Sequence, residues 1–159
     1  MDPWPEPVER VAAVLRQQAV DARLEEFSAG TPTAAAAADA IGCEPAEIVK
    51  SIVFVCDGVP VLALLPGDRR ADPAKVAVAA EAQAGRVASP EEVLAATGFE
   101  PGAVAPFPAP HVSRVLLERE LLRHETVWIG AGSTRHMAGL SPLDLAHLTR
   151  AEVGDLAEG

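Results

Sequence analysis

The stretch AEIVKSIVFVCDGVPVLALLP is apolar except near its start and contains two runs of β-forming residues, 51–56 and 59–65. An Asp-Gly pair separates the runs, which is the strongest short signal for a β-hairpin with a two-residue turn. That turn places Lys50 opposite Leu65 in the predicted register. Because both alternating faces of the first run are apolar, we predict a strand inside the sheet that is covered on both sides.

Other segments begin like helices, with a capping residue followed directly by proline. Serine, threonine or aspartate accepts a hydrogen bond from the first turn, and proline fits the first helical position. Apolar residues also recur with helical spacing near the start of the chain. We predict helices over 8–19, 31–42, 72–85, 89–98 and 141–148, the middle three ending at glycine. The predicted caps are Thr31 before Pro32, Asp72, Ser89 with Glu92 completing a capping box, and Ser141.

Short β-rich segments alternate with these helices, which predicts a mixed α+β fold with helices around a sheet. The chain has 159 residues and is expected to form one domain, residues 1–159 with its core at about 8–150. Its small, acidic tail, residues 149–159, is expected to fray. The further predicted strands are 22–30, 86–88, 125–132 and 133–140, with a strand or mixed element at 114–122.

The formal net charge is −10, which argues against broad, non-specific binding of a nucleic-acid backbone. The segment GDRRADPAK still offers a local basic patch of Arg69, Arg70 and Lys75, with a solvated loop as the alternative. No apolar run is long enough for a transmembrane span, and the start of the chain lacks a signal-peptide pattern. Two cysteines, Cys43 and Cys56, are too few for a disulfide scaffold, so we expect a cytoplasmic protein with reduced thiols.

Lys50 stands out because the chain contains only one other lysine, Lys75, beside eleven arginines. It lies at the entrance of the first hairpin strand. Either its side chain reaches water or a carboxylate such as Asp68, or it is held at the mouth of a pocket. In a pocket, a compact ammonium with three donors would bind a phosphate, a carbonyl or a developing oxyanion.

Two glycine-containing segments offer further candidate site residues. Gly102 lies in an irregular loop, where its N–H or that of Ala103 could reach a ligand, and an ordinary surface loop is the alternative. In GAGSTRHMAG, His136 follows a glycine turn at the end of a strand, and a satisfied structural histidine is the alternative. The four histidines are too widely spread for a metal site, so we expect no metal and no cofactor.

Four motifs follow one another along the chain: VKSIVFV, TGFEPGAVAPF, WIGAGSTRH and LSPLDL. In this order and spacing, the chain resembles the YbaK/prolyl-tRNA synthetase-associated editing domains, which are free-standing aminoacyl-tRNA deacylases. The resemblance extends over residues 8–150 and rests on the whole set of motifs. It implies a mixed, barrel-like sheet surrounded by helices, in agreement with the α+β layout predicted from the pattern.

The resemblance also implies roles for individual residues. Lys50 resembles the family lysine that is essential for deacylation, and Gly102 and Pro106 resemble the GxxxP loop whose backbone contacts the aminoacyl group. His136 resembles a histidine of the alanine-editing branch that limits the pocket. The predicted catalytic residues are Lys50 and Gly102, and the predicted substrate-binding residues are Phe27, Ser51, Ala103, Pro106, Gly132, Ser133 and His136.

The function implied by the resemblance is trans-editing hydrolysis of mischarged tRNA, with Cys- or Ala-tRNA(Pro) as the leading substrates. The partners are then aminoacyl-tRNA, bound by the patch of Arg69, Arg70 and Lys75, and prolyl-tRNA synthetase as a candidate, for a monomer or homodimer without membrane association. Ser51 departs from the family, whose subgroups carry Thr or Asn there, and Pro108 stands where many relatives carry Gly. The alternative is a non-catalytic module that binds an aminoacyl or nucleotide group or a synthetase, which the net charge of −10 favours.

Overall fold

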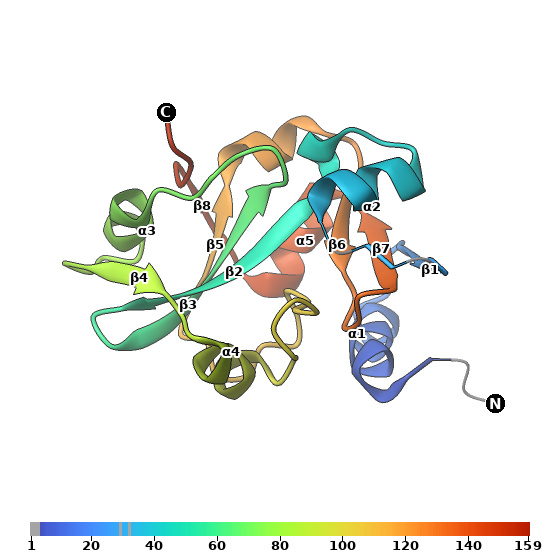
Figure 1. The fold of residues 1–159 in the computed structure, drawn as a ribbon, viewed down its shortest axis with the longest axis horizontal. Coiled ribbons are helices and arrows are strands. Elements are labelled where there is room, and N and C mark those ends of the chain that lie inside the picture. Colours follow the sequence, from blue (N-terminus) through green and yellow to red (C-terminus); the bar gives the residue numbers. More distant parts are fainter. Residues whose placement is uncertain (1–3, 29, 32) are drawn as a thin grey trace.

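The computed structural model describes residues 4–28, 30–31 and 33–159 and shows the predicted mixed α+β architecture (Figure 1). The hairpin of β2 and β3 crosses the middle of the molecule, with helices on either side of it. The elements in chain order are α1 (Glu6–Gln17), β1 (Arg23–Glu26), α2 (Ala34–Ile41), η1 (Pro45–Glu47), β2 (Val49–Cys56), β3 (Val59–Pro66), α3 (Pro73–Ala79), β4 (Gly85–Val87), α4 (Pro90–Thr97), β5 (Val115–Glu118), η2 (Arg119–Arg123), β6 (Val127–Gly130), β7 (His136–Leu140), α5 (Pro142–Thr149) and β8 (Glu152–Gly154).

The described strands form two open sheets. The larger sheet has the order β4-β2-β3-β5-β8, and the smaller has the order β1-β7-β6. A parallel bridge between Ile48 and Trp128 joins the chain just before β2 to β6, so the two sheets meet at this point. Because each sheet ends in two edge strands, the predicted barrel-like closure is not confirmed.

Strands β2 and β3 pair in the predicted antiparallel register, with Lys50 opposite Leu65. β4 flanks the second half of β2, from Phe54 to Cys56, so this half lies inside the sheet as predicted. β4 is too short to reach the first half of β2, residues 49–52. This half of β2 therefore has one edge that no described strand of the larger sheet covers.

The two faces of the β2–β3 hairpin belong to two different hydrophobic cores. One face, which includes Val53 and Leu62, packs in a core with buried residues of α1, α4 and α5. The other face, which includes Phe54 and Leu65, packs with buried residues of α3 and of the last residues of the chain. Burial on both faces removes apolar surface from water, so the hairpin is a firmly held support for the residues at its entrance.

The predicted caps are confirmed for three helices. The side chains of Asp72, Ser89 and Ser141 accept N–H groups from the first turns of α3, α4 and α5. Gly42 and Gly98 end α2 and α4 in the left-handed conformation that glycine adopts at low cost. None of the helices in the described ranges is long and apolar enough to cross a membrane.

Three helices differ from the prediction in their boundaries, and the first, predicted over 8–19, is found over Glu6–Gln17. Thr33, rather than Thr31, caps α2, and the predicted Pro32 start lies outside the described residues. The helix predicted to run to Gly85 ends at Ala79. Gly85 instead begins β4, because its backbone pairs with the end of β2.

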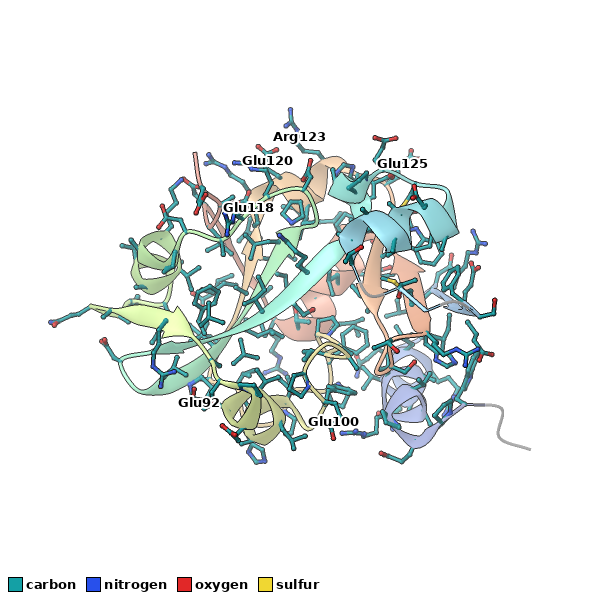
Figure 2. All side chains as sticks on the ribbon, in the orientation of Figure 1. Glu92, Glu100, Glu118, Glu120, Arg123 and Glu125 are labelled. Carbon is teal, nitrogen blue, oxygen red and sulfur yellow. The ribbon has the colours of Figure 1, made fainter. Side chains whose placement is uncertain are left out.

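The acidic tail does not fray, contrary to the prediction. Residues 152–154 form β8, which pairs in parallel with β5, and Leu156 is fully buried. Glu118, labelled in Figure 2, is 1% exposed. Its side chain accepts the N–H groups of Leu156 at 2.8 Å and of Ala157 at 3.1 Å. A buried carboxylate needs such donors. The tail is therefore fixed by a long-range contact that its own composition does not reveal.

Candidate active site

A cavity of about 360 Å³ lies between the start of β2, the loop at 102–104 and the segment that joins β6 to β7. Its volume falls in the range of small-molecule sites, roughly 300–1,000 Å³. Lining residues that were not predicted include Thr31, Thr33 and Ala37, beside or within α2, and Met137 of β7. The predicted site residues that line it are Lys50, Ser51, Gly102, Ala103, Ser133 and His136.

The cavity borders the open edge of β2. Successive residues of a strand direct their backbone groups to opposite edges, and the carbonyl of Val53 accepts the Ala88 N–H at 2.9 Å on the β4 side. By the same alternation, the backbone N–H and carbonyl of Ser51 point to that side, beyond the end of β4. The Ser51 hydroxyl oxygen is buried and has no hydrogen-bond partner among the described residues. The strand edge therefore offers polar groups to a ligand in the cavity.

Lys50 lies half-buried at this edge, and its ammonium donates a hydrogen bond to the main-chain carbonyl of Arg69. Burial lowers the pKa of Lys50, whereas the nearby charge of Asp68 opposes this shift and that of Arg70 adds to it. The alternative that Lys50 pairs directly with Asp68 is not observed among the described ion pairs. An ammonium has three N–H donors, so two remain for a ligand.

Gly102 occupies a tight turn at the rim of the cavity. The Ala103 N–H donates to the Glu100 carbonyl at 2.9 Å, and Gly102 has a φ of +86°, the combination found in a type II turn. The Ala103 amide is thus already engaged, which leaves the Gly102 N–H as the candidate donor. A Cβ at position 102 would meet no atom within 4 Å, so the turn conformation, rather than crowding, requires glycine.

Ser133 and His136 form a hydrogen-bonded pair on the wall of the cavity. The Ser133 Oγ and His136 Nδ1 atoms are 2.6 Å apart, and Ser133 Oγ also accepts the Arg135 N–H at 3.0 Å. His136 is 4% exposed as a whole residue, and burial lowers its pKa, although the carboxylate of Glu26 opposes the shift. The ring of Trp4 packs edge-on against it at 5.5 Å. His136 is therefore a neutral, fixed wall of the cavity near pH 7.

Three predicted substrate-binding residues do not line the cavity. Phe27 packs near Trp128 and uses its N–H for the Arg135 carbonyl at 2.7 Å. Pro106 is buried in the loop after Gly102. Gly132 packs closely against the first turn of α1, since a Cβ there would lie 2.6 Å from the Pro7 carbonyl oxygen.

The three cations of the predicted tRNA patch do not form one surface at the cavity. Lys75 pairs with Asp155 at 3.1 Å and lines a separate cavity between α3 and β8. The guanidinium of Arg69 donates to the Glu158 carbonyl at 2.7 Å. Arg70 is exposed on the same loop as Arg69. None of the three lines the cavity, and Arg69 reaches it only indirectly, through the bond from Lys50 to its main-chain carbonyl.

The described residues contain no group of three or more His, Cys, Asp or Glu side chains placed to hold a metal ion. Cys43 and Cys56 are free cysteines, and burial raises the pKa of both thiols. A thiol with a raised pKa is a poor nucleophile near neutral pH. The chemistry of the cavity thus rests on an ammonium, backbone amides, hydroxyls and a neutral imidazole.

Comparisons with known proteins agree on one family. The profile of the aminoacyl-tRNA editing domain matches residues 28–148. The uncharacterized protein YwhH of Bacillus subtilis (strain 168) is 34% identical over 129 residues, which cover 80% of this chain and 82% of that protein. Proline–tRNA ligase of Lactobacillus johnsonii is 29% identical over 115 residues, or 72% of this chain, but the match spans only 20% of the ligase.

Solved structures extend the likeness to the whole fold. A crystal structure described as that of a candidate trans-editing enzyme for prolyl-tRNA synthetase has a TM-score of 0.89 at 34% identity, covering 98% of this chain and 99% of that one. The hypothetical protein APE2540 has a TM-score of 0.87 at 28% identity, covering 94% and 99%. The profile match and these likenesses establish that the chain belongs to the aminoacyl-tRNA editing domain family.

Proposed function

We propose that this protein is a trans-editing deacylase that hydrolyses the ester bond of mischarged tRNA, with Cys- or Ala-tRNA(Pro) as its substrate. The observation that carries the proposal is that Lys50 and Gly102, which lie far apart in the sequence, line one cavity. Membership of the editing-domain family supports this function. Similarity to a candidate trans-editing enzyme and to part of proline–tRNA ligases supports tRNA(Pro) as the tRNA.

In the proposed reaction, the protein orients and polarises the ester without a covalent intermediate. Water attacks the ester carbonyl carbon, the bond from that carbon to the ribose oxygen breaks, and the ribose oxygen takes a proton. The Lys50 ammonium and the Gly102 N–H stabilise the negative charge that develops on the carbonyl oxygen. One well-placed donor of this kind contributes roughly 3–4 kcal/mol to the transition state. A cysteinyl substrate offers a second route, in which its own thiol attacks the carbonyl and releases the tRNA.

Pocket size is the proposed source of selectivity. A wall made of Ser133, His136 and Met137 limits the space beside Lys50. Size exclusion rejects a larger residue strongly, whereas attraction to a substrate with one extra methylene is worth only about 1–3 kcal/mol. The cavity is therefore proposed to admit alanyl or cysteinyl groups and to exclude the larger cognate prolyl group, with Ser51, Ser133 and His136 setting the limit.

The decisive experiment is a deacylation panel with purified protein and Ala-, Cys-, Ser- and Pro-tRNA(Pro). Lys50→Met keeps the length of the side chain but removes the ammonium, and it is expected to lower kcat by roughly 10²–10³-fold. Arg123→Met is the matched control, because it removes an exposed cation outside the cavity. If no aminoacyl-tRNA is cleaved faster than in buffer, the proposed function is wrong.

A non-catalytic binding module remains the second candidate function. The net charge of −10 and the weak clustering of the three patch cations favour it over direct capture of tRNA. Tight binding of aminoacyl-tRNA without turnover, unaffected by Lys50→Met, would support this candidate. Prolyl-tRNA synthetase is the proposed partner that presents the tRNA in either case. A steep fall of affinity with salt would instead indicate direct phosphate contacts by Arg69, Arg70 and Lys75.

A further inference from the structure

The ammonium of Lys50 is held by a carbonyl that belongs to a loop, not to a strand. Residues 67–72 connect β3 to α3, and the carbonyl of Arg69 accepts the Lys50 hydrogen bond. Within the loop and its approach, the Gly67 N–H bonds the Ile48 carbonyl at 2.7 Å and the Arg69 N–H bonds the Pro66 carbonyl at 3.1 Å. These bonds fix residues 67–69 of the loop, so residues 70–72 must be held by other segments.

The end of the chain supplies that support. We call residues 155–158 the C-terminal strap. The Asp72 N–H donates to the Leu156 carbonyl at 2.8 Å, and the Glu158 N–H donates to the Arg70 carbonyl at 2.9 Å. The guanidinium of Arg69 donates to the Glu158 carbonyl at 2.7 Å. The strap thus bonds Arg69, whose carbonyl holds Lys50, and two of the loop residues that follow it.

The strap itself is anchored in the core. Leu156 is fully buried, and the same oxygen of Glu118 accepts the N–H groups of Leu156 and Ala157. The other oxygen of Glu118 accepts the Glu120 N–H at 2.8 Å. Figure 2 shows Glu118 at the start of η2, on the side of the molecule where the chain ends. A buried carboxylate with three backbone donors is a firm anchor, since leaving those donors unpaired is costly.

We propose that Glu118 and Arg69 are positioning residues that fix the ammonium of Lys50, a residue that lines the cavity, by way of the C-terminal strap and the Arg69 carbonyl. The proposal rests on the proposed function, because it assigns Lys50 its catalytic role. A lysine side chain has several rotatable bonds, and one fixed N–H bond directs the remaining two donors. The carbonyl bond also stabilises the charged form of the amine, so loosening the strap is expected to lower the pKa of Lys50 further.

The test uses Glu118→Gln and Arg69→Ala in the full chain. Arg69→Ala removes the guanidinium bond to the strap but keeps the carbonyl that holds Lys50. We expect a loss of about tenfold in kcat, a change equivalent to one hydrogen bond, with KM nearly constant. The alkaline limb of the pH–rate profile is expected to move to lower pH. A rise in KM with a smaller salt slope and no change in kcat would show that Arg69 only binds phosphate, and would overturn the proposal.

A second readout needs no catalysis. The chain has only two lysines, so lysine labelled with ¹³C at Cε gives two NMR signals, and Lys50→Met assigns the Lys50 signal by its absence. Both variants are expected to lower the pKa of Lys50, whereas the control Arg123→Ala is expected to leave it unchanged. An unchanged pKa of Lys50 in folded Arg69→Ala and Glu118→Gln would overturn the proposal. If the pKa of Lys50 falls in both variants but the parent protein cleaves no aminoacyl-tRNA, the positioning of Lys50 by the strap is supported and the proposed function is wrong.

A double-mutant comparison separates positioning from general stability. In the Lys50→Met background, Arg69→Ala is expected to cause no further loss of kcat, because the group that it positions is gone. The same tenfold loss in both backgrounds would show that the strap acts only on the fold.

Discussion

The two halves of strand β2 have different neighbours, although they belong to one strand of eight residues. The half from Phe54 to Cys56 pairs with β3 on one edge and with β4 on the other, and both named side chains are buried. The half at residues 49–52 pairs with β3 but borders the cavity on its other edge. Lys50, the candidate catalytic residue, lies in this second half.

This difference shows how one strand serves both the fold and the site. We call residues 54–56 the paired half and residues 49–52 the open half. The paired half fixes the register, because a shift by one residue would turn every apolar side chain to the wrong core. The open half inherits that register and offers backbone and side-chain polar groups where the neighbouring strand stops. Unpaired polar groups reduce stability, so a protein retains them where binding requires them.

The largest expected effect on stability comes from a substitution in the paired half of β2. Phe54→Ala removes a ring that is 1% exposed and is expected to lower the free energy of unfolding by roughly 3–5 kcal/mol. In the open half, Ser51→Ala is expected to be neutral or slightly stabilising, because the buried hydroxyl has no described partner to lose. Urea denaturation of both variants measures the difference. Equal losses in the two variants would contradict the proposed division of β2.

Two glycines with positive φ come next: Gly102, which lines the cavity, and Gly132, which does not. Gly132 has a φ of +97° and a Cβ there would lie 2.6 Å from the Pro7 carbonyl oxygen, whereas Gly102 has a φ of +86° and open space around it. Gly102→Ala is expected to cost about 1–2 kcal/mol, the backbone term alone. Gly132→Ala is expected to cost more, because Pro7 must also move. Thermal or urea unfolding ranks the two variants by their loss of stability. A smaller loss for Gly132→Ala than for Gly102→Ala would show that Gly132 and Pro7 are not packed as described.

A third prediction uses the pKa of His136 in the wall of the cavity. Burial lowers this pKa in the folded state below the ordinary value of about 6.5, so the unfolded chain binds the proton more strongly. The free energy of unfolding is therefore expected to be highest above pH 6.5 and to fall as the pH drops toward the folded-state pKa. Glu26 and Arg135 face the ring with opposite charges, and Ser133 and Trp4 are neutral. His136→Gln should remove this part of the pH dependence, and an unchanged slope would contradict the assignment.

The smallest expected effect concerns the support of the paired half. Arg86 of β4 forms two hydrogen bonds with Glu92 of α4, at 2.8 and 2.9 Å. The bond to Arg86, with a backbone bond from Ser89, lowers the pKa of Glu92 to about 2. The stability that Glu92 contributes is thus present above its ordinary pKa of 4.5 and is lost as the pH falls toward about 2. On acid titration, Glu92→Gln should lose less stability than the parent protein. The control is Glu91→Gln, which removes the exposed neighbouring carboxylate and keeps the bonds of Glu92 to Arg86 and Ser89.

Local patterns in the sequence determined much of the fold. The hairpin register follows from the two-residue Asp-Gly turn between two β-forming runs, and the starts of α3, α4 and α5 follow from a capping side chain before proline. These signals act over a few residues, so they can be read without the rest of the chain. The ordered motifs also pointed to Lys50 and Gly102 as candidate site residues, and their roles await the experiments proposed for them.

Only the tertiary structure decided which groups meet across long distances in the chain. The lysine at position 50 is bound by the Arg69 carbonyl, and the acidic tail is held by Glu118, although neither pairing has a local signature. The presence of Thr33 and Ala37 beside the cavity likewise depends on how separate segments pack. Hydrophobic periodicity specifies which face of an element is buried, but the partner on that face is selected by the packing of the complete chain.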